Sequence, residues 1–130
     1  MTKTLLLSLS TAVLVLAAGC APLPEAPVGL LDVTARPAEK ALLAGIRTYE
    51  DGQYAESEKQ LGAALQAGLV SPRDAAAAHK HLAFIYCTSN RAARCEAAFR
   101  DARKADPSFT LSRSEQGHPL WGPTYKRVLP

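Results

Sequence analysis

Apolar residues recur every three or four positions through the middle of the chain, a spacing typical of helices that bury one face. A first stretch of this kind is carried by Ala75, His79, Leu82, Ala83 and Tyr86. A second is carried by Cys95, Phe99, Ala102 and Ala105. It ends at Asp106-Pro107, because proline disfavours helical geometry in the residue before it. The polar triplet Ser89-Asn90-Arg91 separates the two stretches, so the pattern predicts a helical hairpin.

A weaker repeat of the same kind comes earlier, over residues 38–52 and 54–66. Pro37 suits the first position of a helix, where the missing N–H costs nothing. Gly52 permits a tight turn between the two segments. The pattern therefore predicts another hairpin ahead of the first.

A short linker joins the two predicted hairpins. Gly68 is a typical helix stop, and Ser71 and Pro72 are typical of the N-cap and the first position of the following helix. We therefore predict an all-α fold built of two helical hairpins, with boundaries at 38–70 and 71–109.

Residues 110–130 are predicted to cap the end of the second hairpin, which would otherwise expose an apolar side. Ser112 and Glu115 have capping-box spacing, Gly117 would end that helical turn, and a last helix is expected over 124–128. The side chains expected to form the cap are Leu120, Trp121, Tyr125 and Val128. Alternatively, Trp121 is an exposed anchor for a partner, since tryptophan is enriched at binding hot spots.

Length and composition fit one small helical domain, at 130 residues with 48% hydrophobic and 6% aromatic residues. The net charge is +3, and the acidic and basic residues are interspersed. No basic run is long enough to follow a phosphate backbone, so we expect no binding of nucleic acid.

The first 20 residues open with a lysine near the N-terminus and continue as an uncharged apolar run that ends in small residues. This run is short for a membrane span and typical of a secretory signal. Its ending, Leu16-Ala17-Ala18-Gly19-Cys20, resembles the lipobox of bacterial lipoproteins. The resemblance implies a signal peptide at 1–19 and lipidation of Cys20. Because Ala21 follows instead of aspartate, it also implies anchoring in a Gram-negative outer membrane, facing the periplasm. An ordinary cleaved signal with a coincidental cysteine is the alternative.

The stretch 20–37 contains four prolines and shows no helical period. We expect an extended tether between the lipid and the helical domain. Alternatively, Leu30, Leu31 and Val33 pack on the domain as a strap, because three neighbouring apolar residues are costly to expose.

Cysteine counting follows from the lipobox, since assigning Cys20 to the lipid leaves Cys87 and Cys95 out of three. Export would place this pair in an oxidising compartment. The two residues flank the predicted turn of the second hairpin, where antiparallel packing brings them within bridging distance. We predict a disulfide; the alternative is a pair of buried free thiols acting as small core residues.

The sequence offers no arrangement of residues typical of catalysis or metal binding. His79 and His81 are two positions apart and would point to different sides of a helix, with no carboxylate at ligand spacing. We expect His79 to fill a core position and His81 to be solvated. His118 has no identifiable nucleophile partner. We therefore predict no enzymatic activity, no cofactor and no small-molecule substrate.

The second hairpin resembles one tetratricopeptide repeat (TPR), on the residues Leu82-Ala83, Tyr86, Cys95, Phe99, Ala102 and Asp106-Pro107. The first hairpin resembles a degenerate copy, on Gly45, Tyr49, Gly52-Gln53-Tyr54, Leu61, Ala64 and Leu65, with Ser57 in place of the usual alanine. The resemblance implies a protein-binding scaffold whose concave side binds a helix or an extended peptide. The positions that face that groove correspond to Leu42, Ile46, Tyr49, Lys80 and Phe84. Alternatively, the C-terminal segment folds back and fills the groove.

The lipobox, the repeat pair and the tail 117–123 together look similar to small lipoproteins associated with type VI secretion systems. That resemblance implies a protein partner within a cell-envelope machine. The alternatives are a pilotin-like lipoprotein for type IV pilus assembly, a regulatory activator of an envelope enzyme, and self-association through the edge of the repeats.

Overall fold

The computed structural model describes residues 29–130, and this part of the chain contains helices and no strand. The predicted signal peptide, Cys20 and the first part of the predicted tether lie outside the described residues. The helices are α1 (Leu30–Ala35), α2 (Pro37–Glu50), α3 (Tyr54–Ala67), α4 (Pro72–Thr88), α5 (Ala92–Ala105), α6 (Arg113–Gln116) and α7 (Gly122–Val128). The predicted all-α fold of helical hairpins is confirmed.

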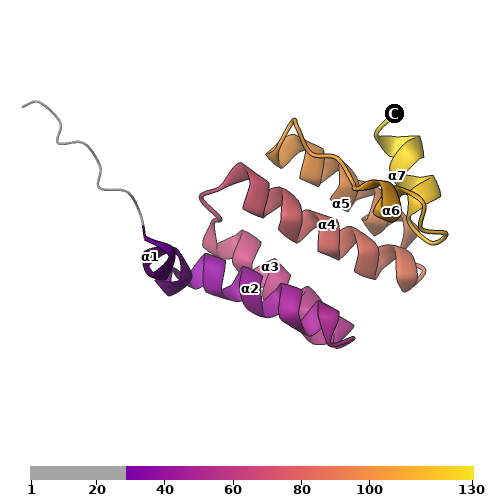
Figure 1. Ribbon diagram of the computed structural model, residues 1–130. Helices are drawn as coiled ribbons and strands as arrows, with labels where there is room; N and C mark the ends of the chain where they lie inside the picture. Colours follow the sequence, from indigo (N-terminus) through magenta and orange to yellow (C-terminus); the bar gives the residue numbers. More distant parts are fainter. Residues whose placement is uncertain (1–28) are drawn as a thin grey trace, which may run out of the picture.

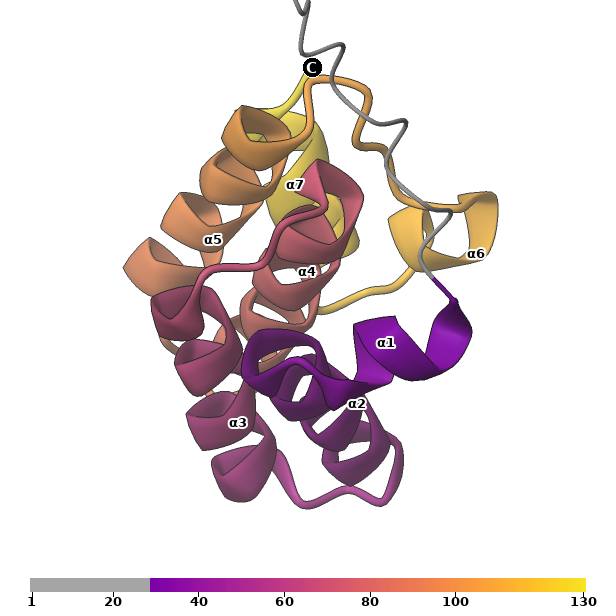
Figure 2. The same ribbon diagram turned by 90° about the vertical axis from the view of Figure 1, so that its left-hand side faces the viewer.

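The helices are arranged as two stacked hairpins with a C-terminal addition (Figure 1). Helices α2 and α3 form the first hairpin, α4 and α5 form the second, and α7 packs against α5. In the turned view, α2 and α4 lie between the pair α3 and α5 on one side and the short helices α1 and α6 on the other (Figure 2). The inner face of the molecule is therefore lined by α2 and α4.

A close helix approach holds the first hairpin together. A Cβ atom added to Gly45 would come within 2.8 Å of the Leu61 side chain, so only glycine fits at this position. The hydroxyl of Ser57, buried in the same contact, donates a hydrogen bond of 2.7 Å to the Gly45 carbonyl. Gly52 turns the chain with φ of 74°, a conformation that glycine adopts without steric cost. The buried Ser57 hydroxyl is therefore satisfied.

The second hairpin is fixed at both of its ends. At the start of α4, the Ser71 hydroxyl accepts the N–H of Asp74, and Pro72 occupies the first turn, as predicted. At the turn between α4 and α5, a disulfide joins Cys87 to Cys95, with a Cα–Cα distance of 5.2 Å. Cys95 is fully buried, so this bridge also fills part of the core.

An ion pair connects the turn of the second hairpin to the first hairpin. The Arg91 guanidinium donates two hydrogen bonds to the Glu58 carboxylate of α3, at 2.9 and 2.8 Å. Arg91 also lies over the Tyr86 ring, 4.5 Å from its centroid. The hydrogen bond from Arg91 is the main reason why the pKa of Glu58 lies below its ordinary value.

The C-terminal segment covers the second hairpin, but with fewer side chains than predicted. Trp121 and Tyr125 are buried and Val128 packs against the core, whereas Leu120 is 56% exposed. Including Leu120 in the cap was therefore wrong, because the turn that buries Trp121 points its neighbour outward. Helix α7 begins at Gly122, two residues earlier than expected, and a Cβ there would overlap the Gln116 carbonyl oxygen.

The predicted extended tether is wrong over its last part. Residues 30–35 form the helix α1, and Pro37 begins α2, as the position of a first-turn proline predicts. Leu31 does not support the alternative of a strap packed on the domain, because its side chain is 83% exposed. Across the described residues, no helix has the length and apolar character needed to cross a membrane.

Candidate partner-binding groove

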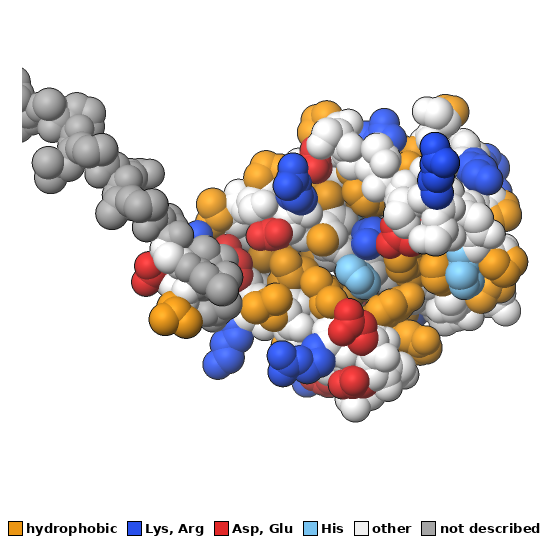
Figure 3. All heavy atoms as spheres, in the orientation of Figure 1, with side chains coloured by type: hydrophobic (Ala, Val, Ile, Leu, Met, Phe, Trp, Pro, Cys, Tyr) orange, Lys and Arg blue, Asp and Glu red, His pale blue; other side chains and the backbone are white. Residues whose placement is uncertain are grey.

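The residues predicted to line a groove occupy facing positions on α2 and α4. Leu42, Ile46 and Tyr49 belong to α2, and Lys80 and Phe84 to α4. The Tyr49 and Phe84 rings approach each other to 6.4 Å between centroids, so the two helices bring both halves of the set together. Figure 3 shows hydrophobic side chains gathered where the two hairpins meet, with charged side chains around them. This concave face, between α2, α4 and α6, is hereafter the groove.

The C-terminal segment fills one end of the groove. The Trp121 ring stacks on Phe84 with 4.1 Å between ring centroids and 20° between planes. Phe84 is only 4% exposed as a result, and Leu42 is only 5% exposed. Of the predicted lining residues, these two belong to the core, whereas Ile46 and Tyr49 remain half-buried. The alternative of a C-terminal segment folding into the groove therefore holds at Phe84.

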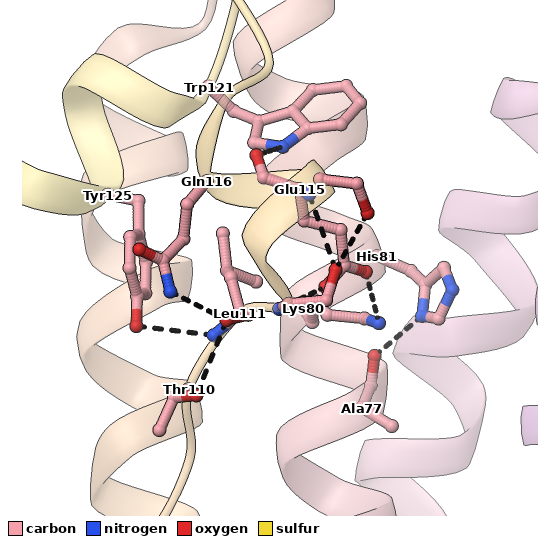
Figure 4. Close-up of polar contacts among 11 residues, drawn as sticks. Ala77, Lys80, His81, Thr110, Leu111, Glu115, Gln116, Trp121 and Tyr125 are labelled. Carbon is pink, nitrogen blue, oxygen red and sulfur yellow. Dashed lines mark hydrogen bonds and ion pairs between the residues drawn. The ribbon is translucent and has the colours of Figure 1, made fainter.

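Helix α6 closes the same end through an ion pair with α4 (Figure 4). The Lys80 ammonium donates to a Glu115 carboxylate oxygen at 2.7 Å. Burial acts to raise the pKa of Glu115, but hydrogen bonds from Lys80 and Ser112 outweigh burial and leave the pKa below its ordinary value. The Trp121 indole donates to the Glu115 backbone carbonyl at 2.9 Å. Lys80, the one charged residue among the predicted lining positions, thus has its charge balanced within the fold.

His81 lies in the groove instead of being solvated as predicted. Its ring contacts Tyr49 edge-on at 5.2 Å and Phe84 at 6.1 Å between centroids. Its Nδ1 lies 2.7 Å from the Ala77 carbonyl oxygen, and because a carbonyl only accepts, Nδ1 carries the proton. Burial is the main cause that lowers the pKa of His81 below its ordinary value. At neutral pH the ring is uncharged.

His79 occupies a different environment on the far side of α4. It lines a surface hollow together with Leu82, Tyr86, Arg94 and Asp101. The side chain is half-buried, and burial lowers its pKa. The prediction of a core position for His79 was therefore too strong, because the side chain keeps one edge in a solvent-open hollow.

Aromatic rings form a continuous series across the groove. The series runs from Tyr54 through Tyr49, His81, Phe84 and Trp121 to His118. Tyr54 is 48% exposed and Trp121 is 8% exposed, so the rings from Tyr54 to Trp121 lead from solvent into the core. The half-buried middle of the series is the part that a partner side chain can reach.

Two residues of the groove were missed by the sequence reasoning, Glu115 and His81. A usable signal existed for His81, because it stands three residues before Phe84, and residues at that spacing share a helix face. For Glu115, the capping box located the helix turn but gave no sign of its pairing with a lysine 35 residues earlier. Only the packing of α6 on α4 creates that contact.

The described residues contain no cluster of three or more histidine, cysteine, aspartate or glutamate side chains placed to hold a metal ion. The surface clefts are open and shallow. One adjoins the start of α4 and is lined by Arg73, Ala76, Ala77, Lys80, Asp106, Ser108, Phe109 and Thr110. Within this cleft the Ser108 hydroxyl donates to the Asp106 carboxylate at 2.6 Å, a contact in the exposed turn after α5.

Comparison with protein-family models, with curated proteins and with solved structures finds no significant match to this chain.

Proposed function

We propose that this chain is a periplasmic lipoprotein anchored in the outer membrane through Cys20, and that it helps to hold or assemble a protein machine of the cell envelope. The observation that carries the proposal is the unoccupied part of the groove, where half-buried Ile46, Tyr49 and His81 form an apolar surface between two hairpins. Such a surface suits a helix or an extended peptide from a partner. Two stacked helical hairpins are also the architecture that the tetratricopeptide resemblance implies.

The assignment to a particular machine comes from the sequence alone. The resemblance to lipoproteins of type VI secretion systems is our first choice, ahead of a pilotin for type IV pili and a regulatory activator of an envelope enzyme. All three share a lipid anchor and a protein partner, so the identity of that partner separates them.

The anchor is tested by replacing Cys20 with serine. Without acyl chains, which contribute about 0.8 kcal/mol per buried methylene, we expect the protein to leave the outer-membrane fraction or to keep its signal peptide uncleaved. Fractionation and intact mass measurement of the exported protein check this. A Cys20→Ser protein that is processed and still floats with outer-membrane lipid would refute the lipobox interpretation.

The partner is tested by placing a photo-crosslinking amino acid at Ile46 in the intact envelope. Lys40 is the matched control, because it lies on the same helix, is exposed and stands six positions before Ile46, which is about 120° around the helix axis. We expect one dominant crosslinked product at Ile46 and none in common at Lys40. Sheath, tube or membrane-complex proteins in that product support the secretion assignment, a secretin supports the pilotin, and a cell-wall enzyme supports the activator. Equal products from both positions would mean that the groove is not the binding face.

A further inference from the structure

Glu50 is an uncompensated carboxylate at the open end of the groove. It lies one helical turn after Ile46 in α2, so the two side chains share a face. Glu50 is exposed, and it forms no hydrogen bond or ion pair with any residue that the structure describes. Glu50 also follows Tyr49, whose ring contacts His81 at 5.2 Å between centroids, so the carboxylate stands next to this ring pair. Its charge acts to raise the pKa of His81, although less than burial lowers it.

The rings beside Glu50 present accessible faces and edges. Tyr49 packs against Tyr54 of α3 at 5.4 Å and against His81 of α4 at 5.2 Å between centroids. Tyr49 and His81 are half-buried, and Tyr54 is exposed. The negative faces of aromatic rings attract cations, most strongly where water is partly excluded.

His81 adds a directed hydrogen-bond acceptor. Because Nδ1 donates to the Ala77 carbonyl, the other ring nitrogen, Nε2, carries a lone pair. Figure 4 shows the His81 ring turned toward the neighbouring hairpin, with one nitrogen on Ala77 and the other pointing away from it. Nε2 has no hydrogen-bond partner among the described residues. This lone pair is available for as long as the ring is neutral.

Repulsion from Lys80 is opposed at this place by the two carboxylates Glu115 and Glu50. Lys80 is the nearest cation on α4, and it is paired with Glu115 at 2.7 Å. The titratable groups that face His81 are thus Tyr49 and Glu50 from α2, Lys80 from α4 and Glu115 from α6. Counted together they carry one negative charge in excess at neutral pH.

We propose that the surface formed by Tyr49, Glu50 and His81 binds an arginine side chain of the protein partner. A guanidinium has a planar face to lie on the rings and several N–H donors to share between the Glu50 carboxylate and His81 Nε2. The assignment rests on the proposed function in one respect, namely that a partner occupies the groove. It adds the chemistry of the residue by which that partner is recognised.

Other partner chemistries fit this surface less well. An acidic segment finds no free cation here, because Lys80 is already paired. A wholly apolar segment would cover Glu50 and His81 Nε2 without satisfying either, and a buried polar atom without a partner is costly. A lysine offers a compact ammonium in place of the planar fork, and so makes fewer simultaneous contacts.

The direct test is a titration of the full chain, purified in detergent, with N-acetylarginine amide and with its neutral isostere N-acetylcitrulline amide. Amide chemical shifts at Tyr49, Glu50 and His81 should move saturably with the arginine compound and weakly or not at all with citrulline. Glu50→Gln should weaken binding about tenfold, which is about 1.4 kcal/mol. Asp51→Asn is the matched control, because it removes the neighbouring exposed carboxylate at the end of α2, which is not among the charges that act on His81, and it should change affinity less than about twofold. Equal shifts with the two compounds, or equal effects of the two variants, would overturn the proposal.

The pH dependence gives a second readout. Since burial lowers the pKa of His81, the acceptor is present at neutral pH and is lost as the pH falls through the folded-state pKa. Arginine binding should therefore decrease as the pH falls below that pKa, and His81→Phe should bind more weakly but lose this dependence. The Ile46 crosslink distinguishes a failure of the arginine site from a failure of the proposed partner function. A crosslinked partner that is insensitive to Glu50→Gln overturns the arginine site alone. Arginine binding without any specific crosslink overturns the partner function instead.

Discussion

Trp121→Ala is expected to destabilise the fold by roughly 3–5 kcal/mol, the usual cost of deleting a buried aromatic side chain. The indole is 8% exposed, stacks on Phe84 with 4.1 Å between centroids and donates to the Glu115 carbonyl at 2.9 Å. Alanine removes all three contributions and uncovers the end of the second hairpin. Domains of this size have total stabilities of about 5–15 kcal/mol, so the variant should lose a large share of its stability.

Thermal unfolding followed by circular dichroism measures the effect. The melting temperature should fall by more than about 12 °C, given about 4–8 °C per kcal/mol for a domain near 100 residues. Leu120→Ala is the matched control, because Leu120 is the adjacent residue, is 56% exposed and should change stability by less than about 0.5 kcal/mol.

As the chain has one tryptophan, its fluorescence reports on the same site. Blue-shifted, quencher-resistant emission is expected. An unchanged melting temperature with water-like emission would show that Trp121 is an exposed anchor.

The sequence sufficed for those parts of the fold that depend on neighbouring residues. The helix stop at Gly68, the cap at Ser71 and the capping box from Ser112 to Glu115 each act within three or four positions, and all three are present. These features together fix the hairpins.

Contacts between distant segments were beyond the same reasoning. The pairs Lys80–Glu115 and Arg91–Glu58 join residues 35 and 33 positions apart, and no local pattern encodes such a pairing. The groove illustrates the consequence. Its helices were predicted, yet its charge balance was not, since the partner of Lys80 stands on a helix that the pattern described only as one capped turn.

Helix α1 was missed for a related reason. Its six residues lie between prolines and are too few to show a helical period. Isolated helices of this length have little stability in water, so propensity gives no useful signal. The short α1 is formed where the chain enters α2, and its position beside the groove is a result of packing.

Reduction of the Cys87–Cys95 disulfide is expected to lower the free energy of unfolding by roughly 2–3 kcal/mol. The bridge spans a sequence separation of 8, and in the chain-entropy model so short a loop gives a value near the lower end of the usual range. The reduced protein should still fold, because α4 and α5 retain the contacts of Phe99, Ala83 and Ala102 along their length. The loosened part should be the turn, including Arg91 and its two hydrogen bonds to Glu58.

Urea unfolding of the Cys20→Ser chain with and without dithiothreitol measures this difference. The double variant Cys87→Ala and Cys95→Ala is the control, because it has no bridge and should show the same midpoint under both conditions. Alanine also fits the fully buried position 95 without adding volume, so the variant reports the loss of the bridge more than a packing error.

Protein taken directly from the periplasm should resist alkylation at both positions and weigh two hydrogens less than the dithiol. Alkylatable thiols in that sample, or a reductant effect as large in the double variant as in the parent chain, would mean that the two cysteines act only as small core residues.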